Sequence, residues 1–449
     1  MFLIALVGPA TAQGQLRWQG SIDIAKGGGE KGPWQQNDSR YNYVDDGTAA
    51  LDADGNIDVA WVEQGKKDVF FQRISTDGAK PLALPVNVSQ SPATFSWLPR
   101  IVRTPDAPGT VYMLWQEIIF SGGSHGGDML FARSTDNGAS FSEPVNISSS
   151  VGGDGKGRIN RDVWHNGSYD LVAGPDGALY AVWTEYDGPL WVSRSADGGK
   201  SFSRPKQIAG GGDAKPVRAP SLALGKDRTL YLAWTTGEDE GADIHVAKST
   251  NGGDSFSAPV LIAAGNTYSD APKLAVGQDG VLHLVYAQSN GGPFSKYQIR
   301  YTRSADGARS FDAPREVSKP LPSSIESAGF PSMAMDGAGR LYVSYELFPD
   351  PSRRPRGLGI VVSQDGGKSF SAPSVVPDSS DPAGGMNGSH QGLLMSKIAA
   401  NRNGAIAIVN SSLQQGRQSR VWLVRGQWTA PNGSDKSERQ EPVSYRNRL

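Results

Sequence analysis

The octapeptide SADGGKSF, residues 195–202, lies between two apolar stretches, and close copies of it recur along the chain. The copies occupy residues 134–141, 249–256, 304–311 and 363–370, with a degenerate version at 75–82. Successive copies begin roughly 54 to 61 residues apart. A constant period of this size is typical of repeat architectures such as propellers. The repeat therefore has to be aligned before any functional residue is assigned.

Each period contains short apolar stretches with alternating character, separated by turn residues, which is the pattern of antiparallel strands. A strand-like segment occurs seven times, once more than the octapeptide, at residues 57–63, 111–117, 179–185, 230–236, 282–288, 341–347 and 406–412. Four strands in each period make one propeller blade. The fold class predicted is therefore all-β: a seven-bladed β-propeller of four-stranded antiparallel blades.

The last period supplies only three strands before the chain becomes polar. The segment LRWQGSIDIAKG, residues 16–27, resembles a fourth strand, so we expect the N-terminal strand to complete the last blade and close the ring. Residues 1–12 resemble a secretory signal peptide, residues 13–428 form the predicted propeller, and residues 429–449 form a polar, disordered tail. We accordingly expect a secreted or periplasmic protein.

Composition narrows the function classes. The 449 residues carry a formal net charge of −1 with interspersed signs, so the basic surface that binds nucleic acid is not expected. Apolar runs fall short of the roughly 20 residues that span a bilayer, so no membrane is expected as a partner. The absence of cysteine excludes disulfides and thiol nucleophiles. We assign no cofactor and no metal ligands, and expect a monomer.

The pattern Ser-x-Asp-x-Gly-x-x-Phe resembles the Asp-box, or BNR repeat, of the sialidase-type propellers. This resemblance covers nearly the whole chain and implies a turn between the third and fourth strands of each blade, away from the ligand-binding end. The residue types agree, because Asp and Ser side chains bond their own turn backbone and Gly adopts positive φ. Asn251 and Ala308 replace the Asp and the second Gly in two copies. We therefore predict that the octapeptides are structural.

Ligand-binding residues are then expected at the opposite rim, where loops are carried by a rigid scaffold. Aligning the repeats gives one central position in each blade: Asp45, Trp97, Gly167, Arg218, Asp270, Gly329 and Leu393. Of these we predict that Asp45, Trp97 and Asp270 bind substrate, together with Arg161 and Tyr169 from the long loop of blade three.

Arg218 is predicted to bind a carboxylate. The segment VRAPSLAL, which begins at Val217, resembles the Arg-Ile-Pro segment through which sialidases bind sialic acid, and a guanidinium suits a carboxylate bidentately. The chain differs from sialidases in the number of blades and in the blade that carries this segment. It also has no tyrosine between Tyr345 and Tyr445, where the family has its nucleophile.

Two long rim loops carry His125 and His165, and a third carries Tyr186. With Arg218 they form the predicted catalytic set. On a uronate, Arg neutralises the carboxylate, one of Tyr or His removes the C5 proton, and another donates to the leaving oxygen. This is β-elimination, and ulvan lyases are among the propellers that resemble this chain. The predicted partner is an acidic polysaccharide, a sialylated or uronate glycan.

Two alternatives stay open. A sialidase-like or other glycoside hydrolase would need paired carboxylates, and Asp45, Asp46, Asp270 and Glu117 are the candidates. A non-catalytic glycan-binding or assembly platform is the third hypothesis, because a fold does not imply a function.

Overall fold

The computed structural model describes residues 14–430 except 34, 36–37, 79–80, 92, 105, 122–123, 150–167, 185–187, 263–266, 294 and 382–395. At residues 119–121 and 124–127 it describes the backbone alone. The predicted signal segment, 1–12, and nearly all of the predicted tail, 429–449, lie outside the described residues.

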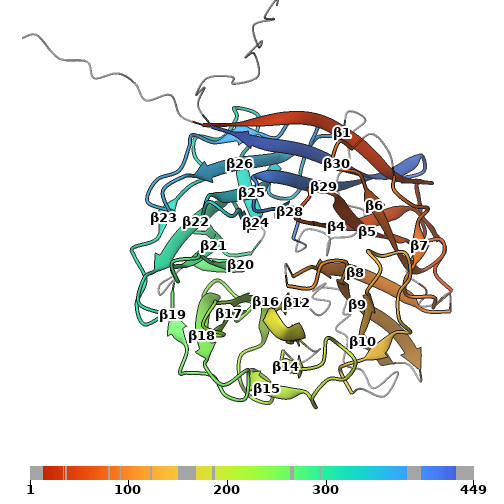
Figure 1. Ribbon diagram of the computed structural model, residues 1–449. Coiled ribbons are helices and arrows are strands. Elements are labelled where there is room, and N and C mark those ends of the chain that lie inside the picture. Colours follow the sequence, from red (N-terminus) through yellow and green to blue (C-terminus); the bar gives the residue numbers. More distant parts are fainter. Residues whose placement is uncertain are drawn as a thin grey trace, which may run out of the picture.

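In the described part of the chain, the strands form seven four-stranded antiparallel sheets around a central axis, with a further two-stranded sheet, β2 (Glu30–Lys31) and β3 (Tyr41–Asn42) (Figure 1). The seven-bladed propeller is confirmed. From the axis outward, the first three blades are β4 (Val44–Leu51), β5 (Ile57–Glu63), β6 (Asp68–Ile74) and β7 (Val86–Asn87); β8 (Phe95–Val102), β9 (Val111–Ser121), β10 (Ser124–Ser134) and β11 (Val145–Asn146); and β12 (Tyr169–Ala173), β13 (Leu179–Thr184), β14 (Leu190–Ser195) and β15 (Lys206–Ala209).

The next three blades follow in the same order. They are β16 (Val217–Leu224), β17 (Leu230–Thr236), β18 (Asp243–Ser249) and β19 (Val260–Leu261); β20 (Tyr268–Val276), β21 (Leu282–Ser289), β22 (Tyr297–Ser304) and β23 (Arg315–Glu316); and β24 (Ser327–Met335), β25 (Leu341–Phe348), β26 (Leu358–Ser363) and β27 (Ser374–Val375). The one helical turn among the described residues is η1 (Pro175–Gly177), and no described helix has the length and apolar character needed to cross a membrane.

The seventh blade joins the two ends of the chain. It contains β28 (Ile398–Ala400), β29 (Ala405–Gln414) and β30 (Gln418–Thr429), and its outermost strand is β1 (Gln15–Gly27). β1 pairs antiparallel with β30 from Gln15 opposite Thr429 to Gly27 opposite Ser419, and the two strands run side by side in Figure 1. The predicted closure by the N-terminal strand is confirmed.

The hydrophobic core lies between neighbouring blades, and each of the seven interfaces contains one apolar cluster. The sequence of β17, LYLAWTT, is apolar at consecutive positions because both faces of this strand are buried. Leu230, Leu232 and Trp234 pack against blade three, whereas Tyr231 and Ala233 pack against blade five. Successive strand residues point to opposite faces, and both faces of a blade are buried here.

The octapeptides lie between the third and fourth strands, at the end of the blade away from the predicted ligand site. In residues 195–202, Ser195 Oγ accepts from the Gly199 N–H at 2.9 Å, and Asp197 accepts from the Ser201 N–H at 3.0 Å. Gly198 and Gly199 have φ values of 71° and 80°, in the region that favours glycine. Phe202 packs edge-on against Phe131 of blade two at 4.9 Å, so the turn also joins neighbouring blades.

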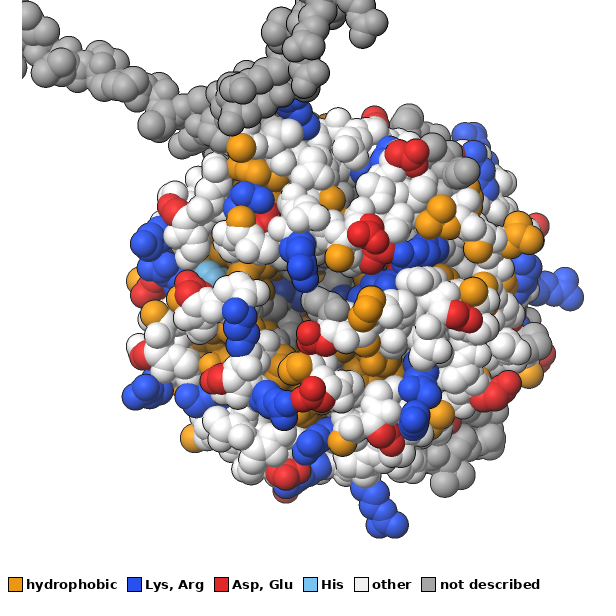
Figure 2. Space-filling model, in the orientation of Figure 1, with side chains coloured by type: hydrophobic (Ala, Val, Ile, Leu, Met, Phe, Trp, Pro, Cys, Tyr) orange, Lys and Arg blue, Asp and Glu red, His pale blue; other side chains and the backbone are white. Residues whose placement is uncertain are grey.

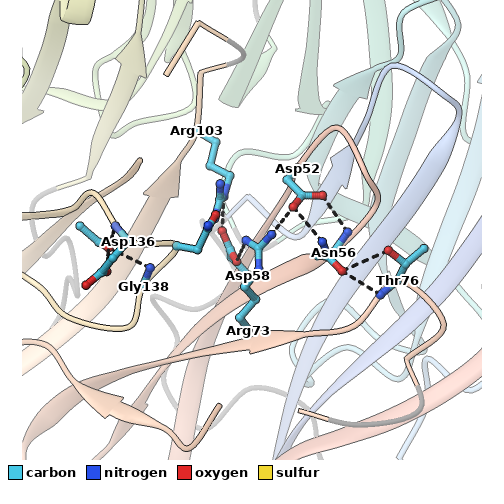
Figure 3. Close-up of polar contacts among 10 residues, drawn as sticks. Asp52, Asn56, Asp58, Arg73, Thr76, Arg103, Asp136 and Gly138 are labelled. Carbon is cyan, nitrogen blue, oxygen red and sulfur yellow. Dashed lines mark hydrogen bonds and ion pairs between the residues drawn. The ribbon is translucent and has the colours of Figure 1, made fainter. Parts of the chain in front are cut away.

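A buried charge cluster joins blades one and two near the turn of blade two (Figure 3). Asp58 is fully buried in β5 and forms ion pairs with Arg73, at 3.0 Å, and with Arg103. Arg103 also donates to Asn137 Oδ1 at 3.3 Å, within the turn. Burial raises the pKa of Asp58, and the two arginines oppose that rise.

Charged side chains show no concentration of one sign on the face seen in Figure 2, where acidic and basic groups are interspersed. This distribution agrees with the formal net charge of −1.

Candidate functional site

A bulge recurs at one place in the innermost strands. In five blades the pairing register shifts after Asp45, Trp97, Arg218, Asp270 and Gly329. The next residue has positive φ in every case: 56° at Asp46, 56° at Leu98, 50° at Ala219, 53° at Ala271 and 46° at Phe330. Non-glycine residues rarely adopt this conformation. A β-bulge changes the direction in which the neighbouring side chains point. The residues aligned in the sequence therefore stand directly before a β-bulge in five of the blades.

Arg218 and Asp270 are brought together in a buried cluster with Tyr268. Arg218 Nη2 donates to the Tyr268 hydroxyl at 2.7 Å, and Arg218 Nε lies 3.3 Å from Asp270 Oδ1. Nη1 of Arg218 donates to the Gly237 carbonyl. The Tyr268 hydroxyl in turn donates to Asp270 Oδ2 at 2.9 Å, and Thr235 donates to Asp270 Oδ1 at 3.0 Å. The cluster therefore links blades four and five through a guanidinium, a phenol and a carboxylate.

Burial and neighbouring charges determine the protonation states of Tyr268 and Arg218. Burial raises the pKa of Tyr268 far above its usual range, and the negative charge of Asp270 adds to the rise. Burial disfavours the charged form of Arg218, yet the pKa of Arg218 is raised, because Asp270 stabilises the cation. At neutral pH the cluster therefore contains a charged arginine and a protonated phenol.

Three further predicted binding residues lie within the protein interior. Asp45 is fully buried and accepts a hydrogen bond from Ser411 of blade seven. Trp97 is 3% exposed, and its Nε1 donates to Gln64 at 3.2 Å. Tyr169 donates to the Trp97 carbonyl at 3.0 Å, so it fixes the bulge of blade two from blade three. The structure thus gives Asp45, Trp97 and Tyr169 contacts that tie neighbouring elements together.

Glu117 is a buried carboxylate below the rim hairpin of blade two. It is 2% exposed and accepts from Ser96 at 2.6 Å, from Trp115 Nε1 at 3.2 Å and from Thr94. Burial raises its pKa to about 7, although these donors oppose the rise. The β9–β10 hairpin continues past Glu117 to the rim, where the backbone of His125 pairs with Phe120.

The remaining predicted catalytic and binding residues lie outside the described part of the chain. They are His165, Arg161 and Tyr186, and for His125 only the backbone is described. Their proximity to Arg218 stays a prediction. Among the described residues, no group of three or more His, Cys, Asp or Glu side chains is arranged to hold a metal ion.

Sequence reasoning did not assign a role to several charged residues near the centre. Lys31 of β2 lies over the Tyr43 ring at 5.6 Å, and its pKa is lowered by burial and then by the positive charge of Arg354. Arg100 and Lys273 each follow a bulge, and both line a small cavity beside the inner strands β8, β12, β16 and β20. Five of the seven blades have Thr48, Asp170, Ser221, Ser332 or Ser396 at the equivalent position, so the repeat alone did not mark these two cations.

Comparisons with known proteins support the fold. No family model and no curated protein matches the chain. The polysaccharide lyase Uly1 is 13% identical, with a TM-score of 0.54 over 92% of this chain and 99% of that one. An ulvan lyase bound to -[GlcA(1-4)Rha3S]- is 11% identical, with a TM-score of 0.53 over 89% and 95%. An α-L-arabinanase of Penicillium chrysogenum complexed with arabinobiose is 15% identical, with a TM-score of 0.51 over 72% and 92%. At these identities the likeness is one of propeller fold.

Proposed function

We propose that this protein is a carbohydrate-active enzyme that cleaves an acidic polysaccharide by β-elimination at the rim around Arg218. The observation that carries the proposal is the contact of 2.7 Å between the Arg218 guanidinium and the Tyr268 hydroxyl. A cation and a phenol side by side supply two of the groups that elimination at a uronate needs. The fold likeness to two proteins named as polysaccharide lyases supports the same class.

Each group has a definite part in the reaction. Arg218 pairs with the uronate carboxylate and stabilises the negative charge that develops when the C5 proton leaves. Its contact with Asp270, at 3.3 Å, is the one that the substrate carboxylate replaces. Tyr268 is protonated at neutral pH, since burial raises its pKa, and Arg218 at 2.7 Å stabilises the phenolate that forms when Tyr268 gives its proton to the leaving oxygen. His125, His165 or Tyr186 takes the C5 proton.

The bonds and protons balance in this scheme. The C5–H electron pair forms the C4=C5 double bond, the C4–O bond breaks, and the leaving oxygen receives the proton of the acid. The products are a new reducing end and an unsaturated uronate that absorbs ultraviolet light.

Hydrolysis is the second candidate, on one observation. A general acid of a glycoside hydrolase has a raised pKa, and burial raises the pKa of Glu117 to about 7. The two reactions differ in their products, because hydrolysis forms no double bond.

A substrate screen separates the three functions. Uronate polysaccharides, including ulvan, are incubated with the protein beside sialosides and rhamnose-capped glycans, and both reducing ends and ultraviolet absorbance are measured. We expect both signals to rise on a uronate polysaccharide. Reducing ends without absorbance would indicate a hydrolase. If neither signal rises, a non-catalytic platform becomes the better interpretation.

A double variant separates the chemistry of the cluster from its contribution to stability. Arg218→Met alone leaves Asp270 buried without its cation, which costs roughly 3 to 5 kcal/mol. Arg218→Met with Asp270→Asn removes both charges, so we expect most of this stability to return while cleavage is lost. Wild-type turnover by the double variant would contradict the proposed site.

Blade six offers a matched control. Arg340, Asp336 and Tyr342 form another Arg–Asp–Tyr cluster, with Arg340 Nε 2.7 Å from Asp336 Oδ2 and the Tyr342 hydroxyl donating to the same oxygen at 2.8 Å. This cluster lies at the turn between β24 and β25, at the end of the blade opposite the predicted site. Arg340→Met with Asp336→Asn should therefore leave cleavage per folded molecule unchanged.

A further inference from the structure

Four aromatic side chains form a row that begins at the Arg218 cluster. Tyr268, whose hydroxyl bonds Arg218, has its ring centroid 6.0 Å from that of Tyr297. The Tyr297 ring is 6.4 Å from Phe330, and the Phe330 ring is 6.1 Å from Phe348. Tyr268 and Tyr297 begin β20 and β22, whereas Phe330 and Phe348 belong to β24 and β25. The aromatic row therefore crosses from blade five to blade six.

The two middle members of the row are less buried than the two ends. Tyr268 is 4% exposed and Phe348 is 6% exposed, whereas Tyr297 and Phe330 are half-buried. Tyr297 packs against the apolar cluster between blades five and six with part of its side chain. Because the rest of each half-buried ring is open to solvent, Tyr297 and Phe330 together present an apolar surface next to the Arg218 cluster.

Backbone features of blade six hold this pair in place. Phe330 is the bulge residue of β24, with a φ of 46°. Gly329 precedes it, and a Cβ added there would lie 3.2 Å from the Phe348 ring and 3.9 Å from the Tyr297 ring. The Tyr297 N–H donates to Ser327 Oγ at 2.8 Å, which links blade five to blade six. The glycine lets the rings approach, so the aromatic pair is already formed in the folded chain.

The repeat shows that the bulge itself does not require an aromatic ring. In blades two, four and five the bulge residue is aliphatic, namely Leu98, Ala219 and Ala271, and each of them also has positive φ. Blade six forms the same irregularity around Phe330. The aromatic ring at this position therefore has a reason other than the folding of the bulge.

The aromatic pair carries no charge. The neighbouring side chains Lys296 and Glu326 form an ion pair at 2.8 Å, so their charges offset one another. The face of an aromatic ring is electron-rich, and it therefore attracts the C–H groups of a sugar and repels an anion. Arg218, by contrast, suits a carboxylate. The rim thus contains a group for an acid and, beside it, a surface for a sugar ring.

We propose that Tyr297 and Phe330 form a sugar subsite that stacks the pyranose ring next to the uronate. The inference rests on the proposed function, which places the uronate carboxylate at Arg218. A six-membered sugar ring is similar in size to the ring of Tyr or Phe, so the two neighbouring rings cover one sugar. The ligand class is a pyranose whose C–H groups gather on one face. The pair contributes to binding and not to the chemistry, because the reacting atoms lie at Arg218 and Tyr268.

Two substitutions of Tyr297 separate the flat ring from the hydroxyl. Tyr297→Leu keeps an apolar side chain but loses the ring, whereas Tyr297→Phe keeps the ring. An interaction made equally in the ground state and the transition state affects KM and not kcat. We expect Tyr297→Leu and Phe330→Leu each to raise KM for ulvan by roughly twofold to tenfold at unchanged kcat. Tyr297→Phe should keep the KM of the wild type.

Phe370, in the octapeptide at residues 363–370, provides the matched control. It is half-buried like Phe330, and its ring lies 4.8 Å from Tyr301 in an edge-on contact. It belongs to the same blade but to the end opposite the rim. Phe370→Leu should lower Tm, as Phe330→Leu does, but should keep the KM of the wild type. A Phe330→Leu protein with lowered Tm and unchanged KM would contradict the subsite.

Binding without cleavage is measured by NMR titration with glucuronate and with ulvan tetrasaccharides. Glucuronate alone reaches Arg218, so its Kd should be the same in the wild type and in Tyr297→Leu. The tetrasaccharides are titrated into the non-cleaving Arg218→Met, Asp270→Asn double variant, where the aromatic pair is intact. Adding Tyr297→Leu to this variant should weaken tetrasaccharide binding, and adding Tyr297→Phe should not.

The outcomes distinguish the subsite from the proposed cleavage. Tetrasaccharide binding that weakens with Tyr297→Leu, in a protein whose wild type cleaves no glycan, would overturn the cleavage and keep the subsite. Cleavage with equal KM in the wild type, Tyr297→Leu and Phe330→Leu would overturn the subsite and keep the cleavage. The subsite is also overturned if Tyr297→Leu leaves the tetrasaccharide Kd unchanged, or if the tetrasaccharides do not bind.

Discussion

The protonation of Glu117 makes the stability of the folded protein depend on pH. Its pKa is about 7 in the folded protein, raised by burial from 4.5. The folded chain therefore binds the proton more tightly than the unfolded chain does. The contribution of Glu117 to stability is greatest below about pH 4.5 and is lost as the pH rises toward 7, by on the order of 3 kcal/mol.

Glu117→Gln should remove this pH dependence. The amide keeps the shape of the protonated acid and can still accept from Ser96 and Trp115, so the variant should unfold at higher urea than the wild type at pH 8. Urea unfolding between pH 4.5 and 8 measures the effect, with the exposed Glu143→Gln as control. Equal slopes of stability against pH in the wild type and Glu117→Gln would show that Glu117 does not titrate in this range.

For single residues, the sequence identified some members of the candidate site but not the contacts between their side chains. Arg218 and Asp270 were found because they occupy equivalent positions of neighbouring repeats, and the structure joins them at 3.3 Å. The contact of Tyr268 with Arg218 was not predicted, because the distance between the hydroxyl and the guanidinium depends on how two blades pack. No period in the sequence encodes that distance.

Among the elements, β1 closes the ring by pairing with β30 along most of its length. Removing residues 14–27 exposes the edge of β30, and an exposed edge pairs with other chains. We expect this deletion to lower Tm and to produce dimers or aggregates, measured by thermal unfolding and light scattering. Removal of residues 1–13 alone is the control and should change neither. A monomer with unchanged Tm after deletion of β1 would mean that blade seven is stable with three strands.

Strand positions followed from alternation in the sequence, but the bulges did not. Leu98, Ala219, Ala271 and Phe330 each precede a proline, which ordinarily favours extended backbone, yet they have positive φ. Local preference is overridden by the packing of the inner strands around the axis. The sequence therefore predicted the order of the strands, whereas the register shifts that aim the candidate residues required the structure.

For the whole molecule, repeated turns make acid stability a collective property. Serine and backbone donors hold the pKa of Asp136 at about 2 and those of Asp197 and Asp306 well below their usual range. Against the effect of burial, the same kind of donors hold the pKa of Asp365 at about 2. Each carboxyl binds its proton more weakly in the folded chain. The stabilisation is therefore complete above the unfolded pKa of about 3.8 and is lost as the pH falls toward 2.

The turn at residues 249–256 shows how this acid sensitivity can be removed. In it Asn251 replaces the aspartate and keeps the geometry, since Oδ1 accepts from the Ser255 N–H at 3.0 Å and Nδ2 donates to Ser255 Oγ at 2.8 Å. Replacing Asp136, Asp197, Asp306 and Asp365 together by Asn should leave Tm at pH 7 nearly unchanged and flatten its fall between pH 4 and 2. The exposed Asp254→Asn is the control and should follow the wild type. An acid transition in the fourfold variant that coincides with the wild type would place the acid sensitivity in other parts of the protein.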